Sequence, residues 1–308
     1  MSGQHHSHDH GHHNHEAHTG HGRAFLLGVT LNLGFVVLEA TYGLVADSLA
    51  LLADAGHNLS DVAGLLVAWA AYWLGRKPPT PQRTYGFRRS SIYASLVNAI
   101  LLLIAVGAIV IEALHRLAAP APTAPLTMMA IAGLGVAINT LTALLFMSGR
   151  KHDLNLRGAF LHMVGDAAVS AGVVLAGLGI ALTGWLWLDP AVSLLIALTI
   201  TLGSWGILRE SVDLAMDAVP PGIDPAEVET YLAKLPGVTE VHDLHIWAMS
   251  TTETALTVHL VRPGHPVDNL FLSDISHRLH EVFGIAHPTI QVETGTENTC
   301  HLAPTDVV

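Results

Sequence analysis

The chain has 308 residues, of which 51% are hydrophobic and only 13% are charged. Soluble globular proteins carry about 25% charged residues, so this composition predicts an integral membrane protein with some soluble mass attached. The formal net charge of −11 argues against nucleic acid as a partner, and the single cysteine, Cys300, excludes an internal disulfide framework.

Histidine is concentrated at the N-terminus, where residues 1–21 hold nine of the 21 histidines. Residues 1–22 are also rich in Gly and Asp and have no apolar core or cleavage-site pattern, so they are not a signal peptide. We expect them to form a disordered, metal-attracting tail in the cytoplasm. The alternative is a solvated low-complexity tail without function.

Six apolar segments follow the tail, and each is close to the ~20 residues that a membrane span requires. Their Leu, Ala, Val, Ile and Gly content and the absence of period-2 alternation predict helices and not strands. We therefore expect an α-helical membrane protein with six transmembrane helices within residues 23–213. The predicted spans lie near residues 24–45, 49–74, 90–114, 126–148, 155–183 and 186–212.

Basic residues are concentrated in the loops after the second and fourth segments. They are Arg76, Lys77, Arg83, Arg88 and Arg89 in one loop, and Arg150, Lys151 and Arg157 in the other. The loops at the opposite ends of the segments carry few basic residues. Since basic loops face the cytoplasm, the pattern places both termini there.

The composition turns polar after residue 213. "PAEVETYLAKL" and "VDNLFLSDISHRLHEVFG" have helical patterns, whereas "VTEVHDLHIWAM", "ETALTVHLVR" and "PTIQVE" have the patterns of strands. The order αββαβ predicts a cytoplasmic α+β ferredoxin-like domain over residues 214–296, followed by a C-terminal tail over residues 297–308.

Two predicted spans carry the same pair of ionisable residues. His57 and Asp61 lie four apart in the second span, and His162 and Asp166 lie four apart in the fifth. Residues at this spacing share one helix face. Because an isolated ionisable residue in a membrane costs roughly 2.5–3.5 kcal/mol, four of them in matched pairs favour a shared partner.

Two imidazoles and two carboxylates suit tetrahedral Zn²⁺, with Co²⁺ and Cd²⁺ also compatible, whereas Mg²⁺ and Ca²⁺ require oxygen shells. Each pair could alternatively be a polar contact between packed helices. Counting residues does not place the pairs at one depth, because the two spans run in opposite directions. The four-ligand hypothesis therefore depends on how the helices pack. Asp54, one turn before His57, is either an orienting partner for an imidazole or a polar residue near the mouth of the span.

The segments "SLALLADAGHNLSD", "GAFLHMVGD", "RTYGFRR" and "HDLHIWAM" resemble bacterial cation diffusion facilitators of the zinc- and cadmium-transporting type. The resemblance covers nearly the whole chain. It implies a multi-pass homodimer in the cell inner (plasma) membrane that exports metal(II) in exchange for protons. It also implies that His57, Asp61, His162 and Asp166 form the transport site. The expected partners are Zn²⁺, protons and membrane lipid.

The resemblance also implies a second, regulatory zinc site in the cytoplasmic domain, at positions occupied by His242, His259 and Glu293. His287 lies nearby in the sequence and is a further candidate ligand. Cys300 and His301 could fold back as ligands, although a lone cysteine more often has no such role.

Three other readings compete with export. A membrane metallohydrolase is disfavoured because the chain lacks HExxH and neither His–Asp pair has a third ligand or a glutamate base, so we expect no enzyme. A metal sensor that binds without transporting, and an importer with the same site, both stay open. A flux assay distinguishes a metal sensor from a transporter, and the phenotype of a deletion strain distinguishes an importer from an exporter.

Overall fold

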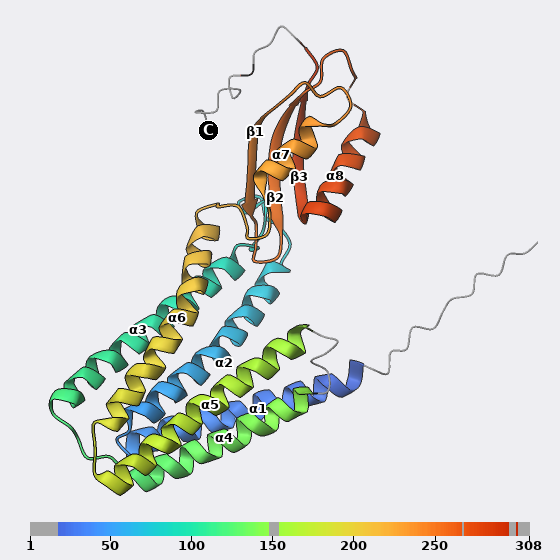
Figure 1. Cartoon of the computed structure of the whole chain (residues 1–308). Helices are drawn as coiled ribbons and strands as arrows, with labels where there is room; N and C mark the ends of the chain where they lie inside the picture. The colour runs from blue at the N-terminus through green and yellow to red at the C-terminus, as the bar shows by residue number, and fades with distance from the viewer. Residues whose placement is uncertain (1–17, 148–153, 267, 296–299, 301–308) are drawn as a thin grey trace, which may run out of the picture. The chain divides into compact units, whose positions relative to one another are not determined.

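The computed structural model describes residues 18–147, 154–266, 268–295 and Cys300 (Figure 1). The predictions for residues 1–17, for Arg150 and Lys151, and for His301 and its neighbours in the C-terminal tail lie outside this part of the chain. The chain divides into two compact units. The first is Met1–Val62 with Ala105–Ile200, and the second is Ala63–Ile104 with Thr201–Val308.

Six long helices lie at the six predicted apolar segments. They are α1 (His18–Val45), α2 (Leu49–Gly75), α3 (Ser90–Ala118), α4 (Pro125–Met147), α5 (Leu154–Thr183) and α6 (Leu188–Ala215). α1 begins at His18, inside the segment predicted as tail. Among the described residues, stretches of α3, α4, α5 and α6 are long and apolar enough to cross a membrane, and α1 adds the shorter apolar stretch Thr30–Val45.

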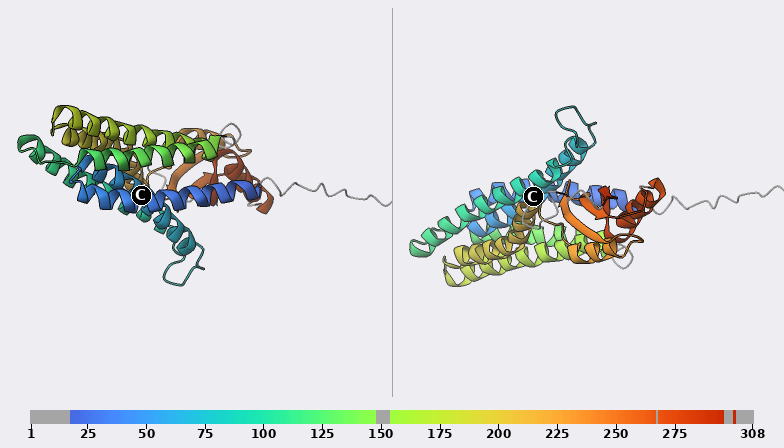
Figure 2. Two further views of the ribbon diagram at one scale, coloured as in Figure 1. Left: turned by 90° about the horizontal axis from the view of Figure 1, so that it is seen from below. Right: turned by 90° about the horizontal axis from the view of Figure 1, so that it is seen from above.

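In the first unit, α4 packs along α5 and against α1 (Figure 2). Glycines allow this close approach. A methyl group at Gly135 of α4 would lie 2.6 Å from the Phe35 ring and 3.0 Å from Ser170 Oγ, and one at Gly177 of α5 would lie 2.7 Å from Met129. Small residues at such positions let helix backbones approach in a membrane, where apolar burial does not drive helices together.

The second unit contains the C-terminal domain, whose elements follow the predicted αββαβ order. They are α7 (Pro225–Ala233), β1 (Glu240–Ala248), β2 (Thr254–Val261), α8 (Asn269–Phe283) and β3 (Ile285–Glu293). The sheet order is β1-β2-β3, with β1 antiparallel and β3 parallel to β2. The parallel pair is possible because α8 provides the crossover between β2 and β3.

Local signals define the ends of both helices in this domain. The side chains of Asp224 and Asp268 each accept a hydrogen bond of 2.9 Å from the backbone N–H two residues later, as N-cap residues do. Gly284 ends α8 with φ +70°, a conformation that glycine adopts without strain, and β3 begins at the next residue.

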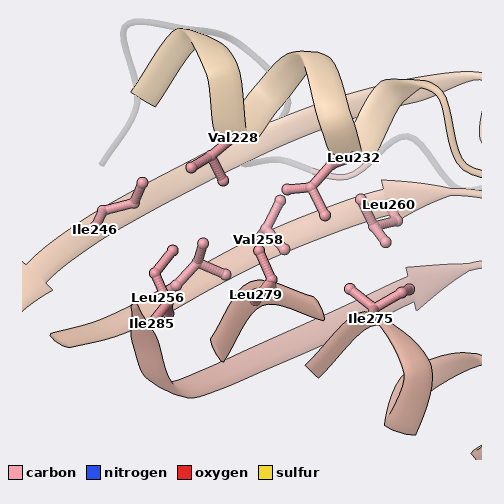
Figure 3. Close-up of a cluster of buried hydrophobic side chains, with 9 residues drawn as sticks. All are labelled: Val228, Leu232, Ile246, Leu256, Val258, Leu260, Ile275, Leu279 and Ile285. Carbon is pink, nitrogen blue, oxygen red and sulfur yellow. The ribbon is translucent and has the colours of Figure 1, made fainter. Parts of the chain in front are cut away.

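The core of the C-terminal domain lies between the two helices and one face of the sheet (Figure 3). Alternate residues of β2 point into it, since strand side chains alternate between faces. The nine core residues are Val228, Leu232, Ile246, Leu256, Val258, Leu260, Ile275, Leu279 and Ile285. His259, between Val258 and Leu260, therefore points to the opposite face of the sheet.

Candidate metal centres

The first unit brings the two His–Asp pairs of α2 and α5 together. Asp61 Oδ2 lies 3.8 Å from His57 Nε2 on its own helix and 3.2 Å from His162 Nε2 on α5. Asp166 lies 3.8 Å from His57 Nε2 and 3.6 Å from His162 Nε2. The ring centroids of the two histidines are 5.9 Å apart. The two pairs therefore lie at one level, the point that counting residues left open.

These distances match the spacing of ligands around a tetrahedral zinc ion. With metal–ligand distances of about 2.0–2.1 Å, neighbouring nitrogen and oxygen ligands lie about 3.3 Å apart. One ligand atom from each of His57, Asp61 and His162, a ring nitrogen or a carboxylate oxygen, lies within 4.8 Å of the other two. Because the sequence predicts that they lie in the second and fifth spans, we refer to these three residues and Asp166 as the intramembrane centre.

Burial differs among the side chains of the intramembrane centre. The Asp166 side chain is 4% exposed, whereas that of His162 is 41% exposed. Asp61 Oδ2 and Asp166 Oδ2 are buried and accept no hydrogen bond from the described residues. Buried polar atoms normally have a partner, so these carboxylate oxygens are available to a cation.

Asp54 is fully buried one turn before His57. Its Oδ2 accepts a hydrogen bond of 2.8 Å from Ser170 Oγ on α5. Ser170 follows Asp166 by one helical turn, so this bond joins α2 and α5 directly beside the centre. Ser170 is not among the predicted site residues, although its place in the i, i+4 series His162, Asp166, Ser170 indicates that it shares their helix face.

Two further polar contacts fix α2 within the first unit. Asn58 Nδ2 donates a hydrogen bond of 3.3 Å to Glu39 Oε2 on α1, and Glu39 is fully buried. At the start of α2, the buried Asp189 carboxylate of α6 accepts from Ser48 Oγ at 2.5 Å, from Leu49 N at 2.8 Å and from Ala50 N at 3.2 Å. Asp189 thus satisfies N–H groups that the first turn of a helix leaves without a partner.

The C-terminal domain forms a second cluster of ligands. His242 on β1 and His259 on β2 are directly paired in the antiparallel register, with ring centroids 5.2 Å apart. Glu293 Oε1, at the end of β3, lies 3.3 Å from His242 Nε2 and 3.1 Å from His259 Nδ1. Because directly opposed residues share a face, the three side chains meet on the face of the sheet away from the core.

Cys300 completes this cluster, with its Sγ 3.4 Å from His259 Nδ1. Thiolate and imidazole ligands of one tetrahedral zinc ion lie about 3.5 Å apart. Both ring nitrogens of His242 and Glu293 Oε1 are buried and lack a hydrogen bond from the described part of the chain. The residues therefore fit a zinc ion, and we call His242, His259, Glu293 and Cys300 the cytoplasmic centre.

His287 does not join the cytoplasmic centre. It is exposed, and its ring contacts that of Tyr85, with the centroids 5.7 Å apart. Six residues of strand separate it from Glu293, which corresponds to about 20 Å. His245 is also outside the group, since its Nε2 bonds Asp243 Oδ1 at 2.8 Å. Asp243 has φ +51° at an irregularity in the β1 register, and sequence analysis gave no sign of it.

Two family models match consecutive parts of the chain. Residues 25–214 match the model of the cation efflux transmembrane domain, and residues 220–295 match that of the cation efflux protein cytoplasmic domain.

Three curated relatives illustrate the similarity. The zinc transporter ZitB of Escherichia coli is 38% identical over 94% of this chain and 92% of its own. The metal cation efflux system protein CzcD of Cupriavidus metallidurans is 35% identical over 94% and 89%. A cadmium, cobalt and zinc/H(+)-K(+) antiporter of Bacillus velezensis is 34% identical over 94% and 93%. With both domain models matched in order over nearly all of its length, the chain belongs to the cation efflux family.

Proposed function

We propose that the protein exports Zn²⁺ from the cytoplasm in exchange for protons, with Cd²⁺ and Co²⁺ as further substrates. The observation that carries this proposal is the convergence of two imidazoles and two carboxylates, from α2 and α5, at separations of 3.2–3.8 Å. The ligand set is intermediate between hard and soft, which suits these three ions. The names of the relatives, which include a zinc transporter and a cadmium, cobalt and zinc antiporter, support the same substrates.

In this proposal, helices α1 to α6 all cross the plasma membrane and both termini lie in the cytoplasm. Residues 23–213 form the transmembrane domain, and residues 214–296 form a ferredoxin-like domain that pairs with that of a second subunit. The basic loop after α2 supports this orientation, because basic loops are retained in the cytoplasm. The match to the cytoplasmic-domain model over residues 220–295 supports the same placement.

Proton coupling follows from the chemistry of the intramembrane centre. Zinc requires neutral imidazole and ionised carboxylate, so zinc and protons compete for the same four side chains. When the centre opens to the cytoplasm, zinc displaces protons from it. When it opens to the other side, protons help to displace zinc. Imidazole is the group best suited to this exchange near neutral pH, since its reference pKa is about 6.5.

The cytoplasmic centre has a regulatory role in this proposal. Its thiolate and carboxylate together balance the charge of Zn²⁺, and its four side chains come from β1, β2, β3 and the residue Cys300 beyond them. Zinc bound there stabilises the sheet and the C-terminal segment in one arrangement, which favours pairing of the domains of two subunits.

The test is zinc flux in proteoliposomes under an imposed pH gradient. Wild-type protein is expected to accumulate Zn²⁺, Cd²⁺ and Co²⁺ in vesicles that are acidic inside, and to do so more slowly when the gradient is removed. Asp61→Ala and Asp166→Ala are each expected to reduce the flux to that of empty vesicles, because each leaves a charged cation with one carboxylate.

Asp213→Ala is the matched control. It removes an exposed carboxylate near the end of α6 whose partner is the exposed Arg209, and it should transport like the wild type. Wild-type flux in either Asp61→Ala or Asp166→Ala would contradict the assignment. Metal binding without flux in the wild type would indicate a sensor instead.

A further inference from the structure

A cavity of about 840 Å³ lies within the second unit, and none of the residues of the two metal centres lines it. Its wall consists of one face of the second half of α2, the loop that follows, the start of α3, Ile207 of α6 and the turn at residues 250–253. Its volume falls within the usual range for pockets that bind small molecules, about 300–1,000 Å³.

The chemistry of the wall changes along the cavity. One end is lined by small residues that include Gly64, Ala71 and Ala94, together with the Asn98 amide, which lies against Gly64, and the other end is lined by the cations Arg76 and Lys77. Twelve residues separate Gly64 from Arg76, which is about 18 Å along a helix. This length is about half the thickness of the hydrocarbon core of a bilayer. The wall therefore suits an elongated molecule with an apolar tail and a negatively charged head.

The cationic end has charge available for a ligand. Glu253 is the acidic residue of the wall, and it is already paired with Arg88 at 2.5 Å. Arg76 lies over the Tyr72 ring at 5.7 Å and Lys77 over the Trp73 ring at 4.9 Å, and neither forms an ion pair with any carboxylate that the structure describes. Two uncompensated cations side by side attract an anion and repel a divalent metal, so the cavity is not an entrance for the transported ion.

We propose that this cavity binds an anionic phospholipid of the cytoplasmic leaflet, with the phosphate at Arg76 and Lys77 and an acyl chain along α2 towards Gly64. The inference rests on the orientation given in the proposed function. Trp69, Tyr72 and Trp73 are exposed on the same stretch of α2, as aromatic residues at the membrane–water interface are. The cytoplasmic leaflet is the negatively charged one, so the ligand is abundant where the cations lie.

Native mass spectrometry of the full-length protein, released from nanodiscs of phosphatidylcholine with phosphatidylglycerol, tests the site. Wild-type protein is expected to retain phosphatidylglycerol in preference to phosphatidylcholine. The double variant Arg76→Gln/Lys77→Gln should retain about tenfold less, since each cation near the surface contributes to attraction of anionic lipid. Ala94→Leu, which narrows the apolar end without changing charge, should also lower retention.

Arg83→Gln is the control, because Arg83 belongs to the same basic loop but stacks on Phe87 at 4.6 Å and does not line the cavity. It should retain lipid like the wild type. The proposal would be overturned if all variants retain as much phosphatidylglycerol as the wild type. It would also be overturned if Arg83→Gln loses as much phosphatidylglycerol as the double variant. The proposal would also be wrong if millimolar inorganic phosphate binds to the protein without displacing lipid. It would be wrong, too, if the double variant changes only the oligomeric state and not the lipid that is retained.

Zinc flux in the same lipid mixtures separates this inference from the proposed function. Flux that rises with phosphatidylglycerol in the wild type and not in Arg76→Gln/Lys77→Gln supports the lipid site. Flux that is unaffected by phosphatidylglycerol, together with no selective retention, refutes the lipid site but leaves zinc export intact. Absence of flux in every mixture refutes zinc export.

Discussion

The thiol of Cys300, the one cysteine of the chain, lies 3.4 Å from His259 Nδ1, where it could bind the zinc ion proposed for the cytoplasmic centre. Cys300→Ser should therefore lower the Zn²⁺ affinity of the cytoplasmic centre by about tenfold or more, since a thiolate is a far stronger zinc ligand than a hydroxyl. It should also remove the thiolate-to-metal absorption of the Co²⁺-loaded protein. Titration calorimetry and absorption spectroscopy measure the two effects.

The control for this variant is His277→Ala, which removes an exposed histidine paired with Glu281 at 3.2 Å on α8. It should bind Zn²⁺ like the wild type. An unchanged affinity and absorption in Cys300→Ser would exclude the thiol from the centre.

The Ser170 hydroxyl donates a hydrogen bond to the buried carboxylate of Asp54 beside the intramembrane centre. Ser170→Ala should weaken zinc binding at the intramembrane centre and lower the free energy of unfolding by about 1–3 kcal/mol, the usual effect of removing the partner of a buried polar group. Ser193→Ala is matched in burial, but the Ser193 hydroxyl donates to the Asp189 carbonyl within its own helix. Equal zinc affinities in the two variants would show that Ser170 has no positioning role.

Among the secondary-structure elements, α2 depends most on its neighbours, because it carries half of the intramembrane centre and its first turn is capped from α6. Asp189→Ala would leave the N–H groups of Leu49 and Ala50 buried without their acceptor. We expect the midpoint of thermal unfolding in detergent to fall, with a loss of about 1–3 kcal/mol for each unpaired group. Asp189→Asn, which keeps one acceptor oxygen, should lie between this variant and the wild type.

The control for the cap is Asp213→Ala, which removes an exposed carboxylate of α6 that pairs with the exposed Arg209 at 3.9 Å. Exposed ion pairs contribute about 0–1 kcal/mol. If Asp189→Ala unfolds at the same temperature as Asp213→Ala, the cap does not stabilise α2.

In the molecule as a whole, the two metal centres belong to separate compact units. Their residues share no partner in the part of the chain that the structure describes, so their binding free energies should add. We expect two Zn²⁺ per chain in the wild type, one in either Asp166→Ala or His259→Ala, and none in the double variant. Elemental analysis of the purified protein after removal of free metal gives these ratios. Loss of both ions from either single variant would show that the centres are coupled.

Much of this organisation is already determined by the sequence. The six apolar segments, the αββαβ order and the two His–Asp pairs depend on local periodicity, because residues four apart share a helix face whatever the rest of the chain does. The positions of His57, Asp61, His162 and Asp166, and the cap residues Asp224 and Asp268, follow from such short-range rules.

Only the tertiary structure decided which of these residues meet. The relative levels of the pairs on α2 and α5 depend on how these two helices pack, and the hydrogen bond from Ser170 to Asp54 is one contact that joins them. Strand register and the position of Cys300 beyond β3 decide that Cys300, and not His287, lies beside His259 in the cytoplasmic centre. The cap of α2 could not be predicted from the sequence for the same reason, since Asp189 accepts a hydrogen bond from the N–H of Leu49, which lies 140 residues away in the chain. No local pattern encodes contacts at such separations, because they form only when the whole chain packs.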